Sequence, residues 1–239
     1  MIILEVCVNS VESAFAAQEG GASRVELCEN LHLGGTTPGA DLLQNVQAAI
    51  SIPLHVMIRP RGGDFFFCVS KFLTMQNDVE MAKQLGANGV VLGILHPDRK
   101  IELDRTSKLI EAARPLRVTF HRAFDLTPDP IQSLEEIISL GIDYVLTSGG
   151  AASVDQGLQA LKLLQQQSKG RITVLPGGGI TLTNVFSLVE QTGVQQIHVY
   201  SAVLAEKRPN RESPRFSDTE LPVTDAKKVK ELRELLSSF

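Results

Sequence analysis

The sequence contains no tryptophan, two tyrosines and only three cysteines among its 239 residues. A small, odd number of cysteines excludes a framework of paired disulfides, so reduced thiols are expected. With 23 Lys and Arg against 27 Asp and Glu, the net charge is −4, and there is no basic excess to attract nucleic acid or an anionic membrane. Neither a nucleic acid nor a membrane is therefore expected as a partner.

The sequence also lacks a long apolar run and a signal peptide. No stretch approaches the length of a membrane span, and the first eight residues have the pattern of a strand. These absences predict a cytoplasmic protein. Walker A, G-x-S-x-G and H-E-x-x-H motifs are missing, as is a dinucleotide fingerprint after the first strand, which leaves nucleotide-dependent and serine-hydrolase chemistry with little support.

What the sequence does have is an alternation of short β-branched runs with amphipathic helical patterns, typical of parallel strands joined by crossover helices. Eight such units favour a closed (β/α)8 TIM barrel over an open doubly wound sheet. The barrel is expected over about residues 1–205 and a C-terminal tail with a helix over about 206–239, all in a single domain. The predicted strands span residues 2–8, 24–28, 54–59, 89–93, 117–121, 144–147, 172–175 and 196–200.

Alternation along these strands predicts which side chains face the barrel axis. In the first strand the apolar set Leu4, Val6 and Val8 faces the helices, which turns Glu5 and Cys7 inward. The same argument turns further side chains inward from the other strands: Arg24, Glu26, Cys28, His55, Met57, Arg59, Thr119, His121 and His198. The interior is therefore expected to be rich in ionisable groups.

A buried set of charges can be purely structural if carboxylates pair with arginines, and Glu5 and Glu26 opposite Arg59 would fit that explanation. Residues at the carboxyl ends of the strands, such as Cys7 and Cys28, lie instead on the face where barrel enzymes build their sites.

Nine ordered segments make the chain similar to one family. They are LEVCV (4–8), SVESA (10–14), GGASRVELC (20–28), GGTTP (34–38), VMIRPRGGDF (56–65), TFHRAFD (119–125), LTSGG (146–150), PGGGI (176–180) and VTD (223–225). Together they resemble the CutC family from the first strand to the C-terminal helix. The resemblance implies a TIM barrel, a cytoplasmic location, a role in copper homeostasis and a homodimer or larger homo-oligomer.

The resemblance further implies Cu(I) binding by the cysteines of the first two strands, here Cys7 and Cys28. Cu(I) is soft and accepts two thiolates, and Met57 could add a thioether. Cys68 lies in a loop, residues 66–72, that departs from the family pattern, and we expect a surface or lid role for it rather than a ligand role.

The alternative is a TIM-barrel enzyme of unassigned reaction that acts on a small anionic substrate, a phosphate or a carboxylate. Guanidinium groups and glycine-rich turns suit such anions. Glu26 and His121 are then the predicted acid and base, although His121 also fits a structural hydrogen-bond network. The predicted substrate-binding residues are Arg59, Arg61, Asp64, Arg122, Asp125, Ser148, Gly149, Gly177, Gly178 and His198.

Overall fold

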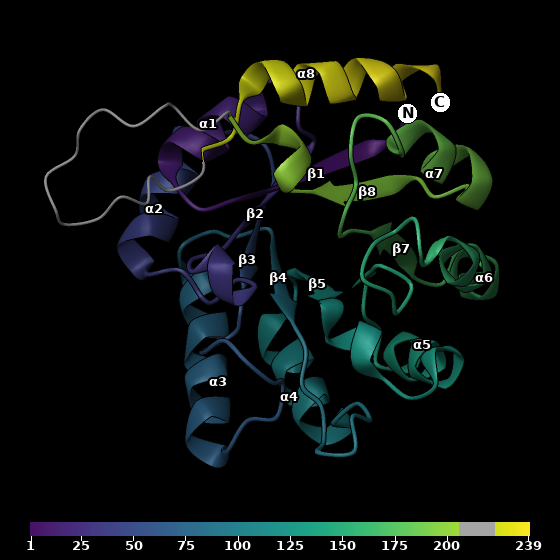
Figure 1. The fold of residues 1–239 in the computed structure, drawn as a ribbon. Helices are drawn as coiled ribbons and strands as arrows, with labels where there is room; N and C mark the ends of the chain where they lie inside the picture. Colours follow the sequence, from purple (N-terminus) through teal and green to yellow (C-terminus); the bar gives the residue numbers. More distant parts are fainter. Residues whose placement is uncertain (206–222) are drawn as a thin grey trace, which may run out of the picture.

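A computed structural model of the chain describes residues 1–205 and 223–239, and in them strands and helices alternate (Figure 1). The strands are β1 (Ile3–Val8), β2 (Arg24–Leu27), β3 (Leu54–Met57), β4 (Gly89–Leu92), β5 (Arg117–Phe120), β6 (Tyr144–Thr147), β7 (Thr173–Pro176) and β8 (Gln196–Val199). The helices are α1 (Val11–Glu19), α2 (Ala40–Ala49), α3 (Val69–Gln84), α4 (Leu103–Ala113), α5 (Pro130–Ser139), α6 (Leu158–Ser168), α7 (Val185–Thr192) and α8 (Ala226–Leu235). Short 3-10 helices follow β2, β5 and β8: η1 (Leu31–Leu33), η2 (Arg122–Leu126) and η3 (Ser201–Val203).

The eight strands form one parallel sheet in the order β7-β6-β5-β4-β3-β2-β1-β8. A parallel bridge between Gly177 and His198 joins the carboxyl ends of β7 and β8 and brings the two edges together. The predicted (β/α)8 barrel is thereby confirmed. Several strands end one or two residues earlier than predicted. β3 stops at Met57, for example, because the chain turns away and the Arg59 N–H bonds the Thr37 hydroxyl at 2.9 Å.

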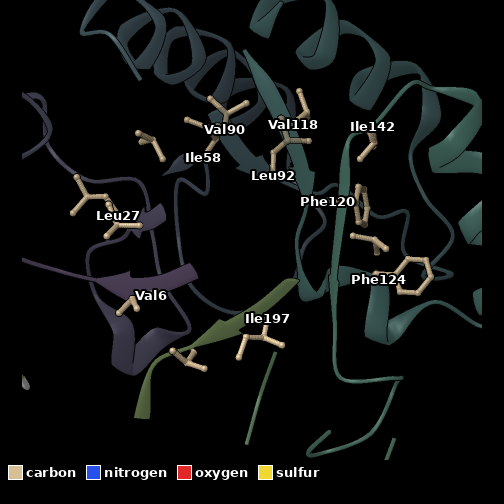
Figure 2. Close-up of a cluster of buried hydrophobic side chains, with 14 of the residues drawn as sticks. Val6, Leu27, Ile58, Val90, Leu92, Val118, Phe120, Phe124, Ile142 and Ile197 are labelled. Carbon is tan, nitrogen blue, oxygen red and sulfur yellow. The ribbon is translucent and has the colours of Figure 1, made fainter. Parts of the chain in front are cut away.

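The phase of the strands agrees with the alternation in the sequence. Outward side chains form a buried apolar layer between the sheet and the helices, part of which is drawn in Figure 2, with Val6, Leu27 and Ile197 contributed by β1, β2 and β8. Inward side chains Cys7 and Cys28 belong to a separate cluster. Each fully buried aliphatic side chain in the outer layer contributes about 1.5–3 kcal/mol to folding, so this layer fixes which side chains remain for the interior.

Local signals in the sequence set the helix ends. The Ser10 hydroxyl accepts a hydrogen bond from the Ser13 N–H and caps α1, and Asp129 caps α5 in the same way ahead of Pro130. Gly193 closes α7 with a φ of 71°, in the left-handed region that favours glycine, and donates to the Val189 carbonyl at 2.9 Å. Ser10 and Asp129 thus fix where helices begin, and Gly193 fixes where α7 ends before β8.

The C-terminal helix α8 confirms the helix predicted near the chain's end. It packs against α1, where Val229 lies so close to Gly20 that a Cβ there would be 2.4 Å away, and the Lys228 ammonium donates to the Leu204 carbonyl at 2.9 Å. The first part of the predicted C-terminal tail, residues 206–222, lies outside the described residues. Every helix among the described residues is too short or too polar to cross a bilayer.

Candidate functional site

A cavity of about 310 Å³ opens at the carboxyl ends of the strands. It is lined by side chains from several strands and from the turns that follow them, in agreement with the position of sites in TIM barrels. The lining includes Cys7, Glu26, Cys28, Leu31, Met57, Arg59, Phe65, His121, Arg122, Leu146, Gly178, Ile180, His198, Tyr200 and Ser201.

The two predicted metal ligands meet at the base of this cavity. Cys7 on β1 and Cys28 just after β2 are 4% and 1% exposed, and their Sγ atoms are 3.9 Å apart. The hydrogen bond between the two thiols outweighs burial and lowers the pKa of Cys7 to about 6. The same hydrogen bond and burial raise the pKa of Cys28 well above its usual value. Of the two, Cys7 is therefore the thiol that loses its proton more readily, and the thiolate is the form that binds a soft metal.

A buried ion pair lies beneath the thiols. Glu5 is 1% exposed and accepts from the Arg24 Nε, and its other oxygen lies 2.7 Å from the His198 Nδ1. Burial raises the pKa of Glu5, but the charges of Arg24 and His198 more than compensate and hold that pKa well below its usual range. Arg24 stands opposite Glu5 in the β1–β2 register. The predicted pairing of Glu5 with Arg59 is therefore wrong, since Arg59 lies past the end of β3.

Glu26 is buried, and no arginine among the described residues pairs with it. Its Oε2 lies 3.4 Å from the Cys28 thiol and 3.8 Å from the His198 Nε2, while its Oε1 has no hydrogen-bond partner in the described part of the chain. Burial raises the pKa of Glu26 to about 8. The raised pKa reduces the cost of burying this carboxyl group without an arginine beside it.

His198, predicted as a substrate-binding residue, faces the thiols. Ligand atoms of Cys7, Glu26 and His198 all lie within 4.8 Å of one another, a spacing suited to one metal ion. Burial lowers the pKa of His198, but the charge of Glu26 and hydrogen bonds with Cys7 and Glu5 raise it well above its ordinary value. The inward phase of the predicted strand over 196–200 is the sequence signal that indicated an interior position for His198. The structure adds that β8 pairs with β1, which places His198 opposite Glu5.

Backbone also closes over the thiols. Gly35 has a φ of 85°, and a Cβ at that position would lie 3.2 Å from the Cys28 Sγ and 3.5 Å from the Met57 Cε. Met57 is 5% exposed and belongs to the same buried cluster as the two cysteines. A third sulfur-containing side chain therefore packs beside the thiol pair at the cavity wall.

The Arg59 guanidinium links two loops by hydrogen bonds to their backbone carbonyls. Its Nη1 donates to the carbonyls of Leu33 and Gly35, both at 2.9 Å, and its Nη2 donates to the Gly63 carbonyl at 2.7 Å. The guanidinium also lies 4.7 Å from the centroid of the Phe65 ring. Although Arg59 lines the cavity, only its buried Nε lacks a partner.

Arg61 and Asp64 form an exposed pair in the loop after β3 and are not among the residues that line the cavity. The Arg61 Nη2 bonds the Asp64 carboxylate at 2.6 Å and the Phe66 carbonyl at 2.7 Å. The structure does not bring these two predicted binding residues to the site.

Arg122 and Asp125 also pair, at 2.8 Å, but here Arg122 lines the cavity. Asp125 accepts from the Ser148 N–H and hydroxyl, and Ser148 in turn accepts from the Arg122 Nη2 at 2.8 Å. Gly149 packs against the backbone of Gly157, where a Cβ would be 2.5 Å from a carbonyl oxygen. Of this set, only Arg122 faces the cavity.

The glycines after β7 have different positions. Gly177 forms the bridge that closes the barrel, whereas Gly178 lines the cavity beneath Arg122. Gly178 has a φ of 102°, in the region that favours glycine, and a Cβ there would lie 2.9 Å from the Arg122 Nη1.

His121 lines the opposite wall. Its Nδ1 accepts from the Ala123 N–H at 3.2 Å, and its buried Nε2 has no partner among residues 1–205 and 223–239. Burial lowers the pKa of His121 to about 3, well away from the near-neutral value expected for an acid–base residue. No hydrogen bond joins His121 to Glu26, although both line the cavity.

Cys68 lies outside the site. It is exposed at the start of α3, with its Sγ 3.2 Å from the Ser70 hydroxyl. In the same divergent loop Phe67 is buried and Phe66 is half exposed. This placement agrees with the expected surface position of Cys68.

Comparison with known proteins identifies the relatives of the chain. The model of the CutC family matches residues 2–203. The human copper homeostasis protein cutC homolog is 48% identical over 196 residues, which cover 82% of this chain and 72% of the human protein. A family protein CutC from Xylella fastidiosa is 44% identical over 236 residues, covering 98% of this chain and 88% of that protein.

Solved structures give the same result. The crystal structure of a CutC protein from Streptococcus agalactiae superposes with a TM-score of 0.80 at 32% identity, covering 83% of this chain and 98% of that one. Thiamine phosphate pyrophosphorylase from Pyrococcus furiosus superposes with a TM-score of 0.63 over 99% of this chain and 96% of its own, but at 20% identity it shares the fold alone.

Proposed function

Because this chain belongs to the CutC family, we propose that it serves copper homeostasis by binding Cu(I) through Cys7 and Cys28. The observation that carries the proposal is the buried pair of thiols, 3.9 Å apart, at the base of a cavity on the functional face of the barrel. In this proposal copper is a cargo ion, and the protein is cytoplasmic and acts as a homodimer or larger homo-oligomer, as the family resemblance implies.

The residues around the thiols fit Cu(I). Thiolate and thioether sulfur are the ligands that Cu(I) prefers, and Cys7, Cys28 and Met57 supply three sulfurs within one buried cluster. The lowered pKa of Cys7 favours the thiolate form that binds a soft metal.

The enzymatic alternative is not favoured. The relatives that match this chain over most of its length are named for copper homeostasis or for the family itself. Within the cavity the predicted acid and base, Glu26 and His121, are not hydrogen-bonded to each other, and Arg59 donates chiefly to backbone carbonyls. The assignments of these residues, and of Arg122 and Gly178 at the cavity wall, stay predictions.

The test is a titration of the whole, reduced protein with Cu(I) in competition with a chromophoric Cu(I) chelator under anaerobic conditions. We expect the protein to bind one equivalent of Cu(I) tightly, and the double variant Cys7→Ser, Cys28→Ser to lose this binding. Cys68→Ser is the matched control. It should bind copper as the wild type does, because this thiol is exposed and does not line the cavity. Unchanged stoichiometry and affinity in the double variant would overturn the proposal.

A further inference from the structure

We propose that His198 is a third metal ligand, so that Cu(I) is held by two thiolates and one imidazole. The inference rests on the proposed function and extends it, since neither the sequence nor the family resemblance assigns His198 to the metal. Three observations support it: the separation of the sulfurs, the orientation of the imidazole, and the groups that hold the imidazole in place.

The first observation is the separation of the two thiols. The Cys7 and Cys28 Sγ atoms are 3.9 Å apart, so both sulfurs could bind one ion. Both come from the neighbouring carboxyl ends of β1 and β2, so one side of such an ion would stay open for a further ligand.

The second observation is that His198 faces that open side. A ring nitrogen of His198 lies within 4.8 Å of the Cys7 Sγ. Its Nε2 is 3.8 Å from the Glu26 Oε2, and that oxygen is 3.4 Å from the Cys28 Sγ. The imidazole thus lies beside Cys7 and the Glu26 carboxyl group, next to Cys28, while its Nδ1 bonds Glu5. Imidazole nitrogen is a suitable copper ligand.

The third observation is the support behind the imidazole. The His198 Nδ1 lies 2.7 Å from the Glu5 carboxylate, and Glu5 is fixed in turn by Arg24. Histidines that bind metals donate their other ring N–H to a carboxylate in this way, which fixes the tautomer and leaves the Nε2 lone pair for the metal. Binding of the ion displaces any proton from that nitrogen. The buried pair of Glu5 and Arg24 therefore positions a ligand as well as stabilising the barrel interior.

Glu26 belongs to the same group of donor atoms, but its carboxyl oxygen is a hard ligand. Cu(I) selects sulfur and imidazole ahead of carboxylate oxygen. The expected donor set is therefore two sulfurs and one nitrogen, with Glu26 beside the ion and outside its coordination sphere.

The deciding experiment is X-ray absorption spectroscopy at the copper edge on the Cu(I)-loaded, full-length protein. The wild type should show two sulfurs and one nitrogen around copper. His198→Asn should leave a two-sulfur site with a copper affinity about tenfold or more lower, and His198→Cys should restore three-coordination with a third sulfur. His96→Asn is the matched control, because His96 is about half exposed and does not line the cavity.

A wild-type spectrum with sulfur ligands alone would overturn the inference, and so would unchanged coordination in His198→Asn. If that variant does not fold, the wild-type spectrum and the His198→Cys spectrum still decide. Failure of the proposed function gives a different result, namely a Cys7→Ser, Cys28→Ser double variant that binds copper as the wild type does.

Discussion

Replacing Arg24 with methionine tests the buried ion pair that underlies the site. Arg24→Met keeps an unbranched side chain against the Tyr144 ring, whose centroid lies 4.7 Å from the guanidinium, but it removes the positive charge beside Glu5. Glu5 is 1% exposed, so its carboxylate cannot be rehydrated without opening the barrel. Of its partners only the histidines would remain, with His198 at 2.7 Å and His55 at 3.8 Å.

The size of the effect follows from this burial. Removing one member of a buried ion pair costs about 3–5 kcal/mol, because an uncompensated charge is left behind. In a chain of this length each kcal/mol lowers the melting temperature by about 2–4 °C, so a decrease of roughly 6–20 °C is expected. Arg171→Met is the matched control. It breaks an exposed pair with Glu135 and should cost less than about 1 kcal/mol.

The assay is urea unfolding of the metal-free protein followed by circular dichroism, with Glu5→Gln and the Arg24→Met, Glu5→Gln double variant measured beside the single variants. Because the double variant leaves no unpaired charge, its loss of stability should be smaller than the sum of the single losses by about 0.5–3 kcal/mol. A single Arg24→Met variant within about 1 kcal/mol of wild type, or strictly additive losses, would refute the argument that this pair is buried and coupled.

Three further predictions concern packing and titration. Gly89→Ala should destabilise the barrel by about 1–3 kcal/mol, because the added Cβ would lie 2.6 Å from the His55 ring. Gly39→Ala is the control in the same unfolding assay. It should be close to neutral, because a Cβ at position 39 would meet no described atom within 4 Å. The pKa of Asp143 is below its ordinary value of 3.8, since hydrogen bonds from Val118, Arg117 and Arg114 outweigh burial. Wild type should therefore exceed Asp143→Asn in stability above pH 3.8 and lose that advantage as the pH falls through the lowered pKa. A difference between the two that does not change from pH 7 to below 3 would contradict this. The His121 ring resonances in an NMR titration should not move between pH 5 and 8, because burial lowers its pKa to about 3, and a midpoint inside that range would disprove the burial argument.

The inward phase of the site could be predicted from the sequence because each strand carries an unbroken apolar set on one face. In β1, Leu4 and Val6 are fully buried in the outer layer, so strand alternation places Glu5 and Cys7 on the inner face. The meeting of Cys7 with Cys28 followed from two neighbouring strands with the same phase. The barrel and the thiol pair are therefore encoded locally, in alternation and in chain order.

Partners across the barrel could not be predicted in the same way. Glu5 pairs with Arg24 because the β1–β2 register places them side by side. His198 reaches Glu5 only because the barrel closes between β8 and β1. Alternation gives the face of a side chain but not its height along the axis, so the sequence left both contacts open.

Residues in the loops also lie in positions that differ from the prediction. Arg61 and Asp64 look like binding residues in sequence because they follow a strand, yet both bond within their own turn and lie outside the cavity. Turn geometry decides this, since the Arg61 guanidinium finds three backbone carbonyls of its own loop within reach. A position just after a strand is thus a weaker predictor of a site residue than an inward-facing position within the strand.

The central claim is that the carboxyl ends of β1 and β2 hold one Cu(I) ion between two thiolates. Anomalous diffraction at the copper edge, from crystals of the reduced protein soaked with Cu(I), tests it most directly. We predict a single strong peak between the Cys7 and Cys28 sulfurs, within bonding distance of both. A peak at Cys68 with none between Cys7 and Cys28 would contradict it.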